Sequence, residues 1–323
     1  MTTTITLPEN HKINVCYGGG VDSTAMLVAL KNQGIRPDLI TFADVGGEKP
    51  DTIEYVKQMD KWLDRVGFPR VTWCKKIPLE STGYTDLEGN CVKNETLPSL
   101  AFGMKSCSIK WKHVPQDYAL KGCKSGPMKC RPHTIWHISQ VTGRKVVKLI
   151  GYDNGMADLR RSKNLKSEDE DFLFVYPLQQ LEWAREDCIK AIAEEGLQIP
   201  IKSACFFCPA SKVWELYWLA GKHPELFEKA LHMEVNAMTG HHTRFNKIEM
   251  GAGFMDLIGS GDRWPSSKTT VGLGRCFAWN HWARMNGVTD KDGVVIRERS
   301  QHFLCMADKL KKTGGNAADL RTC

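Results

Sequence analysis

Apolar and polar positions follow two alternating patterns along the first 200 residues. Segments 22–30 and 52–66 repeat apolar residues at helical spacing and therefore predict α-helices. Five short apolar runs predict β-strands: 13–17, 38–42, 71–74, 145–150 and 172–175. Because strands that alternate with helices are joined by crossover connections, the pattern predicts an α/β fold with a mostly parallel five-stranded sheet covered on both faces.

The pattern changes twice outside these elements. Residues 79–98 are rich in Gly, Asn, Thr and Glu, a composition typical of irregular structure. We therefore expect an insertion in the first domain at about residues 79–100. A helix is expected at 182–195, closed by Gly196, and Pro200 then marks a boundary. We therefore expect a first domain at 1–200 and a smaller, mainly helical C-terminal lobe at 201–323.

Composition narrows the class of protein. The chain has 323 residues with 42% apolar side chains, which is typical of a globular protein. No apolar run is long enough to span a membrane, and residues 1–12 carry no pattern of a secretory signal. Twelve cysteines are too few for a disulfide scaffold in a chain of this length. We expect a cytoplasmic protein with reduced thiols and no membrane partner.

Positive charge is concentrated in one segment. The chain has a formal net charge of +7, yet residues 105–148 contain ten Lys or Arg residues and Asp117 as their one acidic residue. Such a basic block indicates a polyphosphate or nucleic-acid partner, or simply a solvated basic face.

A glycine-rich loop follows the first predicted strand. Gly18, Gly19 and Gly20 precede Asp22, Ser23 and Thr24, where a strand ends and a helix begins. Backbone N–H groups and the helix dipole attract anions at such a junction, and glycines admit phosphate oxygens without obstruction by Cβ atoms. The loop lacks the Gly-Lys-Ser/Thr of a Walker loop and the spacing of the dinucleotide fingerprint. A glycine turn without a ligand is the alternative.

The loop resembles the PP-loop of the N-type ATP pyrophosphatases, in the branch that includes the phosphoadenylyl-sulfate reductases. Asp44 with the Gly46–Pro50 stretch is similar to that branch's second-strand ending, and Gly151 with Asp158, Arg160 and Arg161 is similar to its segment after the fourth strand. Tyr176-Pro177-Leu178 followed by Trp183 is similar to a third motif. Gly18 departs from the family, which has Ser there. The four motifs span roughly residues 13–210.

This resemblance implies a doubly wound domain of the adenine nucleotide alpha hydrolase type that binds ATP or a related adenylyl nucleotide with Mg²⁺. The implied nucleotide-binding residues are Gly18, Gly19, Gly20, Asp22, Ser23, Thr24 and Asp44. Asp22, Arg160 and Arg161 would act at the phosphates, while Lys110 and Lys112 would hold a second anionic group.

Three cysteines form a second candidate site. Cys205 and Cys208 are spaced as C-x-x-C, ahead of a helix expected to begin at Pro209, where the helix dipole would favour thiolates. With Cys107, 98 residues upstream, they resemble the cluster ligands of the iron–sulfur members of the branch. Cys276 is a candidate fourth ligand. A 4Fe-4S cluster is expected; zinc, a redox dithiol and metal-free buried cysteines are the alternatives.

The family's short C-terminal Glu-Cys-Gly-Leu/Ile-His segment is absent from this sequence. The one thiol at the C-terminus of this sequence belongs to Cys323. We therefore expect adenylation of an acceptor, with release of pyrophosphate and cluster-assisted sulfur transfer, using a sulfur donor or reductant protein. Reduction of (phospho)adenylyl sulfate to sulfite is a second hypothesis. A non-catalytic module that binds nucleotide or nucleic acid is a third.

Overall fold

The structure is a computed structural model of the chain. It describes residues 3–102, 106–123, 130–244, 272–274 and 277–312. Cys276 and Cys323, and Lys105, Lys124 and Lys129 of the basic block, lie outside the described residues.

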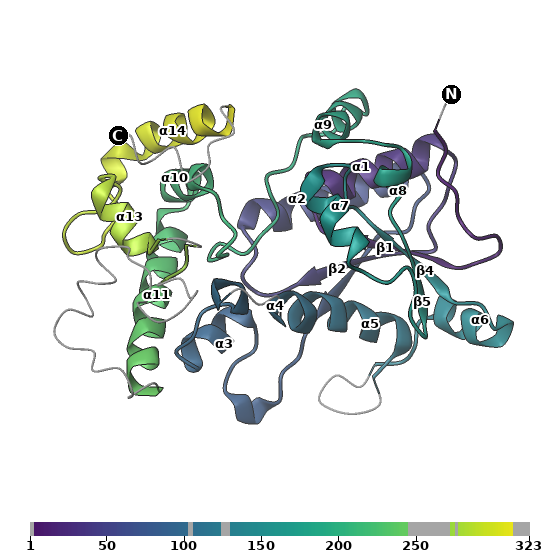
Figure 1. The fold of residues 1–323 in the computed structure, drawn as a ribbon, viewed down its shortest axis with the longest axis horizontal. Helices are drawn as coiled ribbons and strands as arrows, with labels where there is room; N and C mark the ends of the chain where they lie inside the picture. The colour runs from purple at the N-terminus through teal and green to yellow at the C-terminus, as the bar shows by residue number, and fades with distance from the viewer. Residues whose placement is uncertain (1–2, 103–105, 124–129, 245–271, 275–276, 313–323) are drawn as a thin grey trace. The chain divides into compact units, whose positions relative to one another are not determined.

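Five parallel strands form one sheet in the order β3-β2-β1-β4-β5 (Figure 1). The strands are β1 (Ile13–Tyr17), β2 (Leu39–Asp44), β3 (Val71–Lys75), β4 (Val146–Ile150) and β5 (Phe172–Val175). Every pairing between neighbours is parallel. The sheet confirms the expected α/β fold with five strands, each within two residues of its predicted bounds.

The strand order reverses at β1. From β1 the chain moves to β2 and β3 on one side of the sheet, and later to β4 and β5 on the other. Cys16 of β1 pairs with Ile150 of β4, so the segments that follow these two strands begin side by side. In open parallel sheets, ligands bind in the crevice at such a reversal, beyond the carboxyl ends of the strands. The topology is consistent with a Rossmann-like, nucleotide-binding fold.

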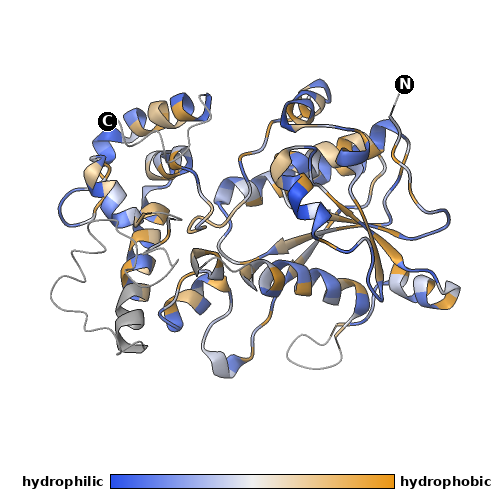
Figure 2. Cartoon of the chain, viewed as in Figure 1, coloured by the Kyte–Doolittle hydropathy of each residue, from blue (hydrophilic) through white to orange (hydrophobic). Residues whose placement is uncertain are grey.

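Helices cover both faces of the sheet. The helices around the sheet are α1 (Val21–Asn32), α2 (Pro50–Arg65), α5 (Val114–Lys121), α6 (Thr134–Thr142), α7 (Met156–Lys163), α8 (Pro177–Gln180) and α9 (Arg185–Glu194). One core packs α1, α2 and α9 against the strands, and a smaller core packs α5 and α6 against the opposite face. Figure 2 shows the strands mostly in hydrophobic colours, as expected of a sheet covered on both sides.

Helix α1 is buried around most of its circumference. Nine of the ten residues from Val21 to Leu30, all except Asp22, are buried, because α1 lies between the sheet and α9. A helix in such a position carries apolar side chains on all sides instead of one stripe. This burial fixes the start of α1, and with it the glycine loop, against the carboxyl end of β1.

The chain divides into two compact units. Unit 1 comprises residues 1–79 and 110–203, and unit 2 comprises residues 80–109 and 204–323. Among its described residues, unit 2 contains helices α3 (Leu87–Lys93), α4 (Ser106–Ser108), α10 (Val213–Lys222), α11 (Pro224–Arg244), α13 (Trp279–Met285) and α14 (Ser300–Lys312). In unit 2, α10 packs against α11 and α14. No helix among the described residues has the length and apolar content needed to cross a membrane.

Two local expectations change. The segment expected to be irregular contains α3, whose N-terminus is capped by the Asp86 carboxylate, which accepts a hydrogen bond from the Gly89 amide at 2.8 Å. Its residues group with unit 2, where Glu88 pairs with Lys229 of α11. The helix expected at Pro209 begins instead at Val213, so Cys208 does not lie at a helix N-terminus. The helix-dipole argument for these thiolates is therefore wrong.

Candidate nucleotide-binding site

The glycine loop directs two backbone amides at one point. The amides of Gly18 and Gly20 both donate to Ser23 Oγ, at 3.2 and 3.3 Å. Gly19 between them has φ +68°, and a Cβ there would lie 2.8 Å from Val56 Cγ2. Backbone amides of a turn that converge on one oxygen can form an anion-binding concavity. The loop therefore has the backbone geometry that a phosphate group needs.

Two further residues pack directly on this loop. A Cβ on Gly151, which follows β4, would lie 2.8 Å from Ser23 Cα and 2.9 Å from Ser23 N. Ser203 Oγ donates to the Gly18 carbonyl at 2.5 Å. Ser203 thus brings a hydroxyl to the glycine loop from a distant part of the chain. Only glycine at position 151 allows β4 to approach the loop so closely.

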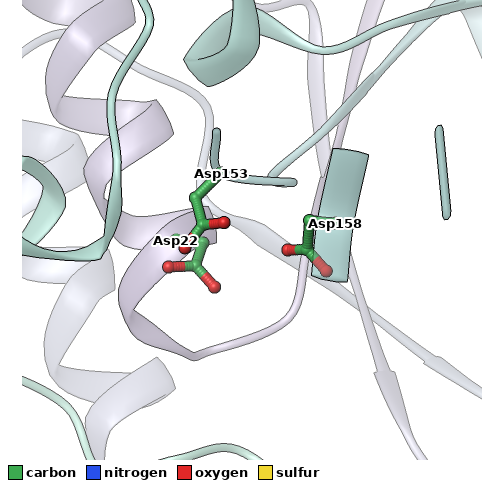
Figure 3. A group of neighbouring side chains, drawn as sticks. All are labelled: Asp22, Asp153 and Asp158. Carbon is green, nitrogen blue, oxygen red and sulfur yellow. The ribbon is translucent and has the colours of Figure 1, made fainter. Parts of the chain in front are cut away.

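Three carboxylates gather beside the loop. Asp22 comes from the first turn of α1, Asp153 from the segment after β4, and Asp158 from α7. One oxygen from each lies within 4.8 Å of the other two, and Figure 3 shows the three side chains directed toward one another. Within the described part of the chain, this is the one group of three or more His, Cys, Asp or Glu side chains at such spacing.

Two arginines offset part of this negative charge. Arg185, the first residue of α9, pairs with Asp22 at 2.6 Å, and Arg161 pairs with Asp158 at 2.5 Å. Burial raises the pKa of Asp22; Arg185 lowers it, and Asp153 and Asp158 raise it further. Burial likewise raises the pKa of Asp158, against the effect of Arg161. The site holds more negative charge than its arginines compensate, a situation that a bound cation would relieve.

Two other predicted nucleotide-binding residues, Thr24 and Asp44, do not take part in the converging amide arrangement. Thr24 is fully buried, and its hydroxyl lies 3.2 Å from Tyr17 OH, so it faces the core behind the loop. Asp44 ends β2 and accepts a hydrogen bond from the Gly46 amide at 2.8 Å. Of the predicted loop set, Gly18, Gly20 and Ser23 form the converging amide arrangement, and Asp22 joins the carboxylates.

The other predicted catalytic residues are spread over two segments. Arg160 is exposed on α7, one residue before Arg161. Lys110 is exposed in a π-helical turn, Ile109–His113. Lys112, in the same turn, pairs at 2.6 Å with Glu48, whose side chain is only 1% exposed. Lys112 is thereby anchored close to the end of β2.

The basic block is partly neutralised within unit 1. Lys112, Lys121, Lys145 and Lys148 pair with Glu48, Asp171, Glu168 and Asp117 respectively. Lys148 is itself buried in β4. Among the described residues of the block, Lys110, Arg131 and Arg144 are exposed.

The three described candidate metal ligands all belong to unit 2. The Cys208 amide donates to the Cys205 carbonyl at 3.1 Å, which places both thiols on one tight turn. Cys205 is buried and Cys208 is half-buried. Cys107 is half-buried in α4, and its amide donates to Ser99 Oγ at 2.8 Å. Thiols suit either an iron–sulfur cluster or zinc. In this structure, however, the three sulfur atoms do not all lie within 4.8 Å of one another.

Sequence reasoning missed three residues of the site: Asp153, Arg185 and Ser203. Asp153 had a usable signal, because it follows the fourth predicted strand by three residues, where a parallel sheet presents its ligand-binding edge. Arg185 had a weaker signal in the sequence. A cation in the first turn of a helix is unfavourable beside the helix dipole, so an arginine there indicates a nearby negative charge. Ser203 had none.

No protein-family model matches the chain, and no curated protein matches it significantly.

Proposed function

We propose that this chain is a PP-loop ATP pyrophosphatase of the phosphoadenylyl-sulfate reductase-like branch. It would bind ATP or a related adenylyl nucleotide with Mg²⁺ and adenylate an acceptor with release of pyrophosphate. Cluster-assisted sulfur transfer would follow. The single observation that carries the proposal is the convergence of two loop amides and three carboxylates where the strand order reverses.

The carboxylates fit Mg²⁺ in their chemistry. Magnesium prefers oxygen ligands and commonly takes one or two carboxylates together with phosphate oxygens. Asp22, Asp153 and Asp158 provide oxygens within 4.8 Å of one another, and burial raises the pKa of Asp22 and Asp158. These residues would hold the ion, which when bound neutralises charge on the phosphate oxygens.

The chain's own groups would position the phosphates. The amides of Gly18 and Gly20 would donate to a phosphate oxygen in place of Ser23 Oγ, leaving that hydroxyl to donate to the nucleotide as well. Arg161 and Arg185, now held by carboxylates, would stabilise the negative charge that develops on the departing pyrophosphate. Chemistry at a phosphoryl group depends mainly on such positioning and charge stabilisation.

For sulfur transfer, the support from unit 2 is limited to the presence of three cysteine thiols that could serve as cluster ligands. Cys205 and Cys208 share one turn, and Cys107 belongs to the same unit. These three thiols would hold an iron–sulfur cluster, which when bound presents or activates sulfur. Cys276, the fourth candidate, would be tested with them.

The experiment combines turnover with metal content on anaerobically purified protein. We expect Mg²⁺-dependent release of pyrophosphate from ATP with an acceptor drawn from tRNA, DNA or small metabolites, and loss of release in Asp22→Asn and Ser23→Ala. We expect iron and sulfide in the wild type and their loss in Cys205→Ser. Sulfite production from adenylyl sulfate without ATP turnover would contradict the adenylation, and stoichiometric zinc without iron would contradict the cluster.

A further inference from the structure

Cys123 and Cys130 lie directly opposite one another in unit 1. They form an isolated antiparallel bridge between the end of α5 and the segment that leads to α6. The Cys123 amide donates to the Cys130 carbonyl at 2.9 Å. Residues paired in this hydrogen-bonded register have Cα atoms about 5.5 Å apart, which falls inside the range that a disulfide spans.

Several contacts hold the two segments in this register. The Cys130 thiol donates to the Tyr118 carbonyl at 3.4 Å, and the His133 amide donates to the Leu120 carbonyl at 2.9 Å. Gly122 has φ +75°, and a Cβ there would lie 2.8 Å from both the Cys130 carbonyl oxygen and the Pro132 nitrogen. Contacts on both sides of Cys123 and Cys130 therefore hold these two residues opposite one another. Any residue other than glycine at position 122 would strain this arrangement.

The buried cysteines of unit 1 are less reactive toward disulfides than the half-buried pair Cys123 and Cys130. Burial raises the pKa of Cys74 and Cys188 to about 12, which keeps both thiols protonated at neutral pH. Thiol–disulfide exchange requires the thiolate, so these residues are poor participants. Cys123 and Cys130 are both half-buried, so a small oxidant can reach them.

We propose that Cys123 and Cys130 are a redox modification site that closes to an intramolecular disulfide. One thiolate attacks a small oxidised disulfide such as glutathione disulfide, forming a mixed disulfide and releasing one glutathione. The second thiolate displaces the other glutathione, so two protein thiols and one glutathione disulfide become one protein disulfide and two glutathiones. The ring so closed contains Lys124 and Lys129 of the basic block. This inference does not depend on the proposed function.

Peptide mapping tests the pairing directly. The full chain is equilibrated with glutathione disulfide, its remaining thiols are alkylated, and it is digested with trypsin, which cuts after Lys124 and Lys129 between the two cysteines. We expect peptide 122–124 joined to peptide 130–144, and separation of the two by reductant. Glutathione on both cysteines without a link, a link to Cys74, or no oxidation would each overturn the proposal.

Variants separate the geometry from simple thiol reactivity. Gly122→Ala keeps both thiols but disturbs the bridge, so we expect at least about a fivefold lower yield of the linked peptide. Cys305→Ser, at an exposed position of α14, is the matched control and should leave the yield unchanged. Equal yields from Gly122→Ala and the wild type would show that the observed register does not direct the reaction.

Discussion

Two buried or half-buried carboxylates, one in each unit, have contrasting environments. Glu234 of unit 2 is fully buried and accepts four hydrogen bonds, from the amides of Leu273, Trp279 and Asn280 and from the Asn280 side chain. Asp22 of unit 1 has one ion pair, with Arg185, and two like-charged neighbours, Asp153 and Asp158.

The difference separates a structural carboxylate from a functional one. The hydrogen bonds to Glu234 satisfy both of its oxygens and hold the start of α13 against α11, so little capacity is left for a ligand. Burial raises the pKa of both Glu234 and Asp22, yet only around Asp22 do further carboxylates add to the effect. In this chain, a raised carboxyl pKa therefore indicates a candidate site only where neighbouring carboxylates contribute to the shift.

The largest expected effect comes from Glu234→Ala. Removing the carboxylate leaves three backbone amides without their acceptor, those of buried Leu273 and Trp279 and of half-buried Asn280. We therefore expect the free energy of unfolding to fall by about 3 to 5 kcal/mol. Denaturant unfolding measures this, with Glu186→Gln, an exposed carboxylate of α9, as the control. A loss of unfolding free energy below about 1 kcal/mol would contradict a structural role for Glu234.

A smaller effect is expected from Arg185→Ala. The Arg185 side chain is 41% exposed, so loss of its pair with Asp22 should lower the free energy of unfolding by about 1 kcal/mol. Nucleotide affinity should fall more, because Asp22 then loses its cation and the phosphates lose a donor. Lys190→Ala, on the exposed face of the same helix, is the matched control. Equal ATP affinity in the two variants would argue against a phosphate role for Arg185.

The smallest effect, and the one with the opposite sign, is expected from Asp153→Asn. An amide oxygen can still accept the hydrogen bond that Asp153 receives from the Gly155 amide at 2.9 Å. One of three clustered negative charges is removed, so the free energy of unfolding should rise by about 0.5 kcal/mol. Thermal unfolding without Mg²⁺ measures this rise. A clear destabilisation would mean that the cluster is structural, like Glu234.

The sheet and the glycine loop were predictable because their signals are local. Five apolar runs marked the strands, and the loop Gly18–Gly20 marked the carboxyl end of β1, where the strand order reverses. The partners of Asp22 were harder, since Arg185 lies 163 residues away and reaches it only through the packing of α9 on α1. The start of α10 was misplaced because Pro209 is compatible with a helix start yet lies in a turn.

The most direct test of the central claim is a calorimetric titration of ATP into the wild type and Asp22→Asn, with and without Mg²⁺. The account predicts that the wild type binds ATP, that Mg²⁺ strengthens binding, and that Asp22→Asn weakens the Mg²⁺-dependent part by at least about tenfold. The Glu186→Gln control should bind as the wild type does. Absence of ATP binding, or equal Mg²⁺-dependent affinity in Asp22→Asn, would contradict the assignment of this loop and its carboxylates to a nucleotide site.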